Sequence, residues 1–273
     1  MITAGEREID PYSKLEFVEL SHEWGHGVPS MPGTPDVVMY RSVKHAQHGV
    51  MATRLKMGMH TGTHMNAPIH LVQRGIDMAN VPLDRFFGNG VILSIPKARW
   101  ELIEPADLEA ASPAVQSGDF VVVVTGWHHR YSDSLEYFGE SPGLSEAAAD
   151  WLVAQGISVF AIDTPQVDHP LATSLGAHRG GPIMNRLPAH FQHETGLEPA
   201  TTHSNWNGAH KKLLAAGIPT IEQVGGDVDS VLGRRATFHA APWKGRSLDA
   251  CPVRFVAIFD PTGQNRIEPG SNS

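Results

Sequence analysis

The chain has a single cysteine, Cys251, among its 273 residues. One cysteine excludes an intrachain disulfide framework, and a lone cysteine is most often a small buried apolar residue. No apolar run approaches the ~20 residues that span a bilayer. The first residues, MITAGEREID, lack the apolar core of a secretory signal. These absences predict a cytoplasmic protein that has no membrane partner.

The chain is also short of positive charge. It has 21 Lys and Arg residues against 29 Asp and Glu, a formal net charge of -8. Because nucleic-acid binding requires a basic surface, nucleic acid is not an expected partner. The length suits one domain with a sizeable core. We therefore expect a single domain over residues 1–273, with a frayed polar tail from 264 to 273.

Histidine, in contrast, is abundant. The chain holds 16 histidines, where roughly a third to a half of that number is typical, so some are expected to be ligands. Its 27 glycines and 20 prolines predict many turns and a loop-rich β architecture.

The periodicity of the sequence predicts a mixed α/β domain. Two expected helices, residues 145–155 and 207–216, each stop at a glycine and continue into an apolar strand, a pattern typical of helices packed on a sheet. A shorter helix is expected at 105–111. Short alternating or apolar runs predict strands at residues 15–20, 51–57, 91–95, 120–124, 157–162 and 254–259.

The densest chemical signal is the segment HTGTHMNAPIH at residues 60–70. It places His60, His64, Asn66 and His70 within eleven residues. Its glycine and proline disfavour a helix, so a turn or loop after the 51–57 strand is expected. Such a loop can fold imidazole nitrogens around one zinc, manganese or iron ion. The alternative is an accidental cluster on a histidine-rich surface, since the spacing matches no zinc finger.

A second pair is His210, on the expected helix, and Glu222, in the strand that follows it. Taken alone, such residues are usually on the surface. Glu222, however, lies in the apolar run IPTIEQV, where a buried carboxylate needs a partner such as a cation.

Three further residues have less definite roles. Asp163 follows a strand and resembles a turn aspartate. His22 and His26 either line a pocket or belong to a turn.

At these residues the sequence resembles the cyclase-like metal-dependent hydrolases, the family of bacterial kynurenine formamidase and isatin hydrolase. The family motif reads His-x-Gly-Thr-His-x-Asp-x-Pro-x-His, and residues 60–70 match every fixed position except Asn66. The segments LSHEWGHGVPSMPG, AIDTPQVD and CPVRFVAIFD, and the spacing of His210 and Glu222, are also similar to the family pattern. The resemblance extends over residues 15–260.

The resemblance implies a fold and a set of roles. The fold would be a swivelling β/β/α domain with a twisted, barrel-like mixed sheet flanked by helices. Family members are usually homodimers or homotetramers with active sites near subunit contacts. His70 would be the catalytic general acid or base. The metal ligands would be His60, His64, Asn66, His210 and Glu222.

Asn66 stands where the family has an aspartate. A carboxylate there adds negative charge and can bridge two cations, whereas an amide does neither. Two divalent ions with one carboxylate fewer repel each other more strongly. We therefore expect one zinc or manganese ion rather than two.

These features predict a metal-dependent hydrolase that opens an amide, a cyclic imide or lactam, or an N-formyl bond of a small molecule through a metal-activated water. Such an enzyme acts on C–N bonds other than peptide bonds, as an arylformamidase or cyclic amidase does. Serine catalysis lacks support because the G-x-S-x-G match at residues 139–143, GESPG, does not follow an expected strand as a nucleophile elbow would. Two alternatives stay open: a non-haem iron oxygenase, or a catalytically inactive homologue that binds a small molecule.

Overall fold

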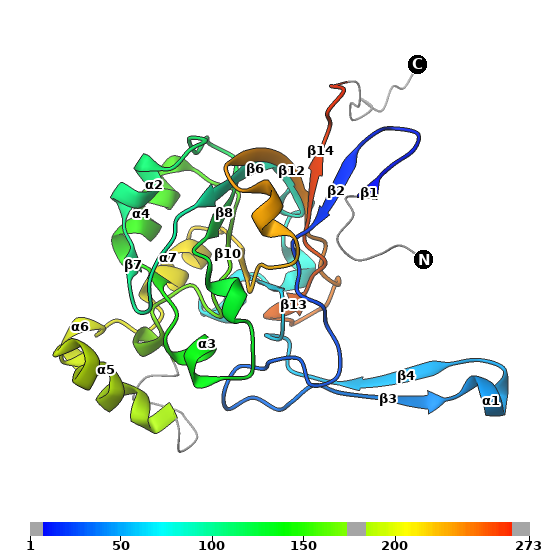
Figure 1. The fold of residues 1–273 in the computed structure, drawn as a ribbon, viewed down its shortest axis with the longest axis horizontal. Helices are drawn as coiled ribbons and strands as arrows, with labels where there is room; N and C mark the ends of the chain where they lie inside the picture. Colours follow the sequence, from blue (N-terminus) through cyan, green and yellow to red (C-terminus); the bar gives the residue numbers. More distant parts are fainter. Residues whose placement is uncertain (1–7, 174–183, 264–273) are drawn as a thin grey trace.

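The computed structural model describes residues 8–173 and 184–263, so the tail expected to be frayed lies outside the described part. A curled sheet of ten strands dominates this part (Figure 1). In sheet order its strands are β1 (Glu8–Ile9), β2 (Glu16–Glu19), β14 (Val256–Phe259), β12 (Arg234–His239), β6 (Phe87–Ser94), β8 (Phe120–Val124), β10 (Val159–Ile162), β11 (Thr220–Glu222), β5 (His64–Asn66) and β13 (Ala250–Pro252).

The central strands β6, β8, β10 and β11 run parallel, and the strands on both sides of them pair antiparallel. All five residues of β8 are buried, as expected for a strand covered on both faces. Because side chains alternate along a strand, the sheet has two apolar faces. One face packs against the helices, and the other packs against the curled flanking strands.

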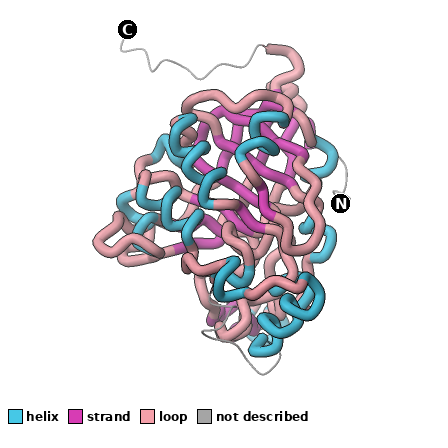
Figure 2. Tube along the Cα trace, turned by 90° about the vertical axis from the view of Figure 1, so that its left-hand side faces the viewer, coloured by secondary structure: helices cyan, strands magenta, loops and turns pink. Residues whose placement is uncertain are grey.

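A layer of helices covers one side of the sheet. In Figure 2, which is turned so that this side faces the viewer, helices lie in front of the strands. The helices of the described residues are α1 (His45–His48), α2 (Pro105–Ala110), α3 (Leu135–Gly139), α4 (Glu146–Gln155), α5 (Leu187–Thr195), α6 (Pro199–Thr202) and α7 (Gly208–Ala215). Of these, α2, α4 and α7 contribute to the core cluster on this face of the sheet. Leu152 of α4 and Leu213 of α7 pack on Phe160 of β10 in one core cluster. The mixed α/β architecture predicted from the sequence is confirmed.

The ends of the predicted helices agree with the observed ends to within one residue. The side chain of Ser145 accepts a hydrogen bond from the backbone of Ala148 and caps α4, which ends at Gly156 in the left-handed conformation. The helices α2 and α7 begin and end within one residue of the expected bounds. Helices α1, α3, α5 and α6 were not predicted, because they are short or carry weak periodicity.

The expectation of a turn or loop over residues 60–70 was wrong at its centre. Residues 64–66 form β5, a strand buried inside the large sheet. Its glycine and proline neighbours bound the strand rather than prevent it, because three residues suffice to pair with β11 and β13. A short 3-10 turn over Pro68–His70 follows.

The strand expected at residues 51–57 is present, but it lies in a two-stranded hairpin outside the large sheet. Among the described strands, β4 (Ala52–Lys56) pairs only with β3 (Val38–Val43), and α1 joins the two at their tip. All five residues of β4 are exposed, and the hairpin extends away from the sheet as an arm (Figure 1). A separate small pair joins β7 (Leu102–Ile103) and β9 (Gly143–Leu144). Over the described ranges, no helix is long and apolar enough to cross a membrane.

Candidate metal centre

Strand register brings four polar side chains together on one face of β5 and β11. His64 and Asn66 lie two residues apart and therefore point the same way. Antiparallel pairing places Glu222 opposite His64, and Thr220 opposite Asn66. All four are buried, whereas Met65 between them faces the apolar core on the other side of the sheet. The sheet therefore holds this polar group away from bulk water.

His60 completes a set of three metal-ligand atoms. Its Nδ1 lies 3.3 Å from Nε2 of His64, and that nitrogen lies 3.1 Å from Oε2 of Glu222. Ligand atoms about 2.0–2.1 Å from a tetrahedral zinc ion are about 3.3 Å from one another. These two distances, together with one ligand atom from each residue lying within 4.8 Å of the others, fit one small divalent cation.

The hydrogen bonds of His64 favour a cation at this point. Its Nδ1 lies 2.8 Å from the carbonyl oxygen of Gly62 and must donate to it, so in the neutral ring Nε2 carries a lone pair. That lone pair points toward the carboxylate of Glu222. Two electron-rich atoms repel at this distance unless a proton or metal ion lies between them. Backbone carbonyls fix metal-binding histidines in this way.

Glu222 is held as a carboxylate. Burial alone would raise its pKa, but a proton on Nε2 of His64, which would donate to the carboxylate, and the nearby imidazoles lower the pKa below its ordinary value. Its second oxygen accepts a hydrogen bond from the backbone N–H of Val167 at 3.1 Å. A buried anion with this orientation supplies the negative charge that a divalent ion requires.

His210 approaches the same carboxylate from α7. Its Nδ1 lies 3.5 Å from Oε1 of Glu222, and its Nε2 lies 2.7 Å from Oγ1 of Thr220. Burial lowers the pKa of His210 to about 3, so the ring is neutral near pH 7. The carboxylate of Asp168 accepts the backbone N–H groups of Ala209 and His210, at 2.8 and 3.0 Å. Asp168 thus fixes the start of the helix that carries His210.

Asn66 offers an oxygen to the same face. Its Nδ2 donates to Oγ1 of Thr220 at 3.2 Å, while Oδ1 is buried without a hydrogen-bond partner in the described part of the chain. An unsatisfied buried carbonyl oxygen is unfavourable. A nearby cation would satisfy it, so this amide also fits a metal site.

His70 lies at the edge of this group, and a residue that sequence reasoning missed lies beside it. Oδ2 of Asp249 is 3.3 Å from Nδ1 of His70 and 2.8 Å from Nε2 of His60. Hydrogen bonds with the two rings lower the pKa of Asp249. Asp249 is 189 residues from His60 in the chain, and no motif marked it. Its only signal was a position just before the closing strand segment.

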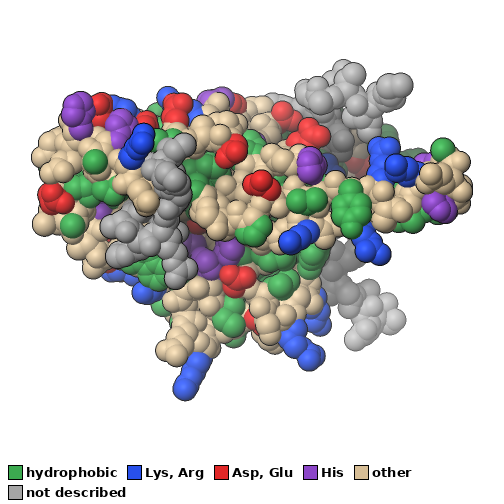
Figure 3. Space-filling view, turned by 90° about the horizontal axis from the view of Figure 1, so that it is seen from below, with side chains coloured by type: hydrophobic (Ala, Val, Ile, Leu, Met, Phe, Trp, Pro, Cys, Tyr) green, Lys and Arg blue, Asp and Glu red, His purple; other side chains and the backbone are tan. Residues whose placement is uncertain are grey.

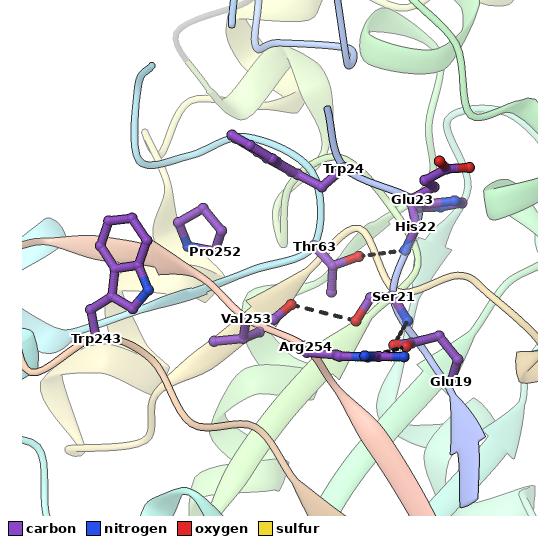
Figure 4. Close-up of a pocket in the computed structure, with 10 residues that line it drawn as sticks. All are labelled: Glu19, Ser21, His22, Glu23, Trp24, Thr63, Trp243, Pro252, Val253 and Arg254. Carbon is purple, nitrogen blue, oxygen red and sulfur yellow. Dashed lines mark hydrogen bonds and ion pairs between the residues drawn. The ribbon is translucent and has the colours of Figure 1, made fainter. Parts of the chain in front are cut away.

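The other residues singled out from the sequence lie elsewhere. Asp163 is buried and accepts the backbone N–H groups of Thr125 and Gly126, so it organises a turn. His22 lines a cavity of about 530 Å³, in which Figure 4 shows it opposite Trp243. Nδ1 of His26 accepts the backbone N–H of Met39 at the base of the arm.

Comparison with known proteins defines the class. The model of the putative cyclase family matches residues 18–169, more than half of the chain, and the chain belongs to this family. A kynurenine formamidase of Erythrobacter litoralis (strain HTCC2594) is 27% identical over 171 residues, which cover 61% of this chain and 74% of that protein. The family resemblance seen in the sequence is thereby confirmed.

Solved structures share the fold. An isatin hydrolase bound to the product analogue thioisatinate has a TM-score of 0.72 at 19% identity, covering 90% of this chain and 93% of its own. A potential metal-dependent hydrolase with cyclase activity has a TM-score of 0.64 at 22% identity, covering 89% of this chain and 98% of its own. These similarities place the curled sheet and its helices in a known architecture.

Proposed function

We propose that this protein is a metal-dependent hydrolase of small molecules that opens an amide, a cyclic imide or lactam, or an N-formyl bond. The convergence of His60, His64 and Glu222 carries the proposal. Nε2 of His64 lies 3.3 Å from Nδ1 of His60 and 3.1 Å from Oε2 of Glu222, and one ligand atom from each residue lies within 4.8 Å of the others. Family membership and the hydrolase names of the similar proteins support it.

The proposed cofactor is one zinc or manganese ion. His60, His64 and Glu222 would hold it, with Oδ1 of Asn66 and the ring of His210 as the further ligands expected from the family motif. Two neutral imidazoles and a carboxylate suit either metal. The amide of Asn66 adds no charge, so a second cation next to the first would be poorly compensated.

In the proposed reaction, the ion would activate water and His70 would transfer the proton. A divalent ion in this position would lower the pKa of a bound water and polarise the scissile carbonyl. His70 would take the water proton and deliver it to the leaving nitrogen. About a quarter of its side chain is exposed, so it can reach a substrate that enters from solvent.

A substrate screen tests the proposal. Protein loaded with zinc or manganese is assayed with formanilide, isatin and succinimide, in air and under nitrogen. We expect hydrolysis of at least one probe, at the same rate with or without oxygen. Turnover that requires oxygen would identify an oxygenase instead. Binding of the probes with no turnover by fully loaded protein would identify an inactive homologue.

A further inference from the structure

Asp249 is held in place by the sheet. Its backbone carbonyl accepts the N–H of Ala67 at 2.8 Å, and the next residue, Ala250, pairs with Asn66 across β13 and β5. Its carboxylate is about half exposed, so it is neither a core residue nor a free surface charge. The backbone therefore presents this carboxylate at a fixed position beside the histidine motif.

One oxygen of Asp249 faces two histidines. An ionised carboxylate can only accept hydrogen bonds, so the nitrogens that face Oδ2 must both donate. These are Nε2 of His60, at 2.8 Å, and Nδ1 of His70, at 3.3 Å. A neutral imidazole has one N–H and one lone pair. The lone pair of His60 is then on Nδ1, toward His64, and that of His70 is on Nε2.

We infer that Asp249 is a positioning residue that sets both tautomers, so that His60 presents Nδ1 to the metal and His70 presents Nε2 to the reacting water. This inference rests on the proposed hydrolase function for the role of His70. It adds a residue outside the family motif to the site. It also joins metal binding and proton transfer through a single carboxylate.

Loss of Asp249 should have two measurable effects. A ligand histidine without its hydrogen-bond partner typically loses about 10–100-fold in metal affinity. A base histidine held in the wrong tautomer loses up to about 10⁴-fold in rate. Asp249→Asn is the conservative variant, since it keeps the volume of the side chain while placing an N–H donor beside the two rings.

Imidazole nitrogen-15 NMR tests the tautomers without any assay of activity. Spectra of the metal-free and zinc-loaded protein at pH 8 are compared with those of Asp249→Ala and Asp229→Ala. Asp229 is a matched control because its carboxylate contacts His128 and His129, each at 3.2 Å.

Signals assigned with His60→Gln and His70→Gln should show Nε2–H for His60 and Nδ1–H for His70 in the parent protein. Only Asp249→Ala should change them. Unchanged signals in Asp249→Ala would overturn the inference.

A double-mutant cycle tests the effect on rate. At saturating zinc, Asp249→Asn should lower kcat by ~10²–10⁴ with little change in KM. In a His70→Ala background the same change should cost less than about threefold, because Asp249 acts through His70. An equal cost in both backgrounds would contradict this. A protein with the expected NMR signals and no turnover would refute the hydrolase proposal but not the tautomer assignment.

Discussion

His64 and His70 belong to one motif, yet their surroundings differ. His64 is buried between Gly62 and Glu222, whereas His70 is partly exposed at the edge of the group. His70→Ala should therefore keep the metal and lower kcat by ~10²–10⁴, as expected for a general acid–base residue. His64→Ala should lose the metal. Elemental analysis and kinetics of the two variants check this. If His70→Ala lost the metal as fully as His64→Ala, the assignment of roles would be wrong.

Asn66 gives a second prediction at this scale. Asn66→Asp should raise metal affinity at least tenfold or permit a second ion, because two unit charges about 4 Å apart interact by about 4 kcal/mol at an effective dielectric constant of about 20. Calorimetric metal titration of the parent protein and of Asn66→Asp measures the affinity and the stoichiometry. Asn89→Asp is the control, since Asn89 lies on β6 and accepts a hydrogen bond from Thr237. Unchanged affinity and stoichiometry would mean that Asn66 does not contact the metal.

The sequence predicted the residues of the site that lie in short patterns. His60, His64 and His70 share one motif, and Glu222 follows His210 within a helix and strand. Asp249 could not be predicted in this way, since it reaches His70 from 179 residues away. Its place depends on which strand pairs with the free edge of β5, and local periodicity does not contain that information.

At the scale of elements, the turn before β5 depends on Gly62. Its φ is +61°, and an added Cβ would lie 2.8 Å from Cδ1 of Trp24. Gly62→Ala should therefore destabilise the protein by about 1–3 kcal/mol and weaken metal binding, because the carbonyl of Gly62 orients His64. Gly33→Ala is the matched control, with a φ of +87° and no atom within 4 Å. Denaturation of both variants measures the difference. Equal losses would show that the contact with Trp24 has no effect.

The arm shows the limit of prediction from periodicity for an element. Alternation in residues 51–57 predicted a strand, and a strand is present. In the described structure, however, all of β4 is exposed, because it pairs only with β3 outside the large sheet. Isolated two-stranded hairpins are marginally stable in water. The pattern predicts the strand but not what covers it.

For the whole molecule, this arm supports the expectation of a homodimer or homotetramer. Large apolar side chains are exposed along it: Val38, Tyr40, Val50, Met51 and Leu55. Residues 38–56 contain four Lys or Arg and no Asp or Glu, in a chain of net charge -8, and Figure 3 shows basic side chains on this projection. An apolar, basic arm on an acidic protein is complementary to a second copy of the same chain.

Light scattering with size-exclusion chromatography tests this association. The parent protein should have the mass of a dimer or tetramer at micromolar concentration. Tyr40→Ser with Leu55→Ser changes both faces of the arm and should weaken assembly by at least about tenfold, because two apolar contacts are lost. Leu83→Ser is the control, since Leu83 is 83% exposed and lies outside the arm. A monomeric parent protein, or variants that assemble unchanged, would contradict the prediction.

The most direct test of the whole account is the metal content of the purified protein before and after chelation. The rate of hydrolysis is measured on the same samples, with whichever probe the protein turns over. We predict about one zinc or manganese ion per chain, loss of activity when the ion is removed, and recovery when it is restored. A protein that contains no metal and keeps its full activity after chelation would contradict the account.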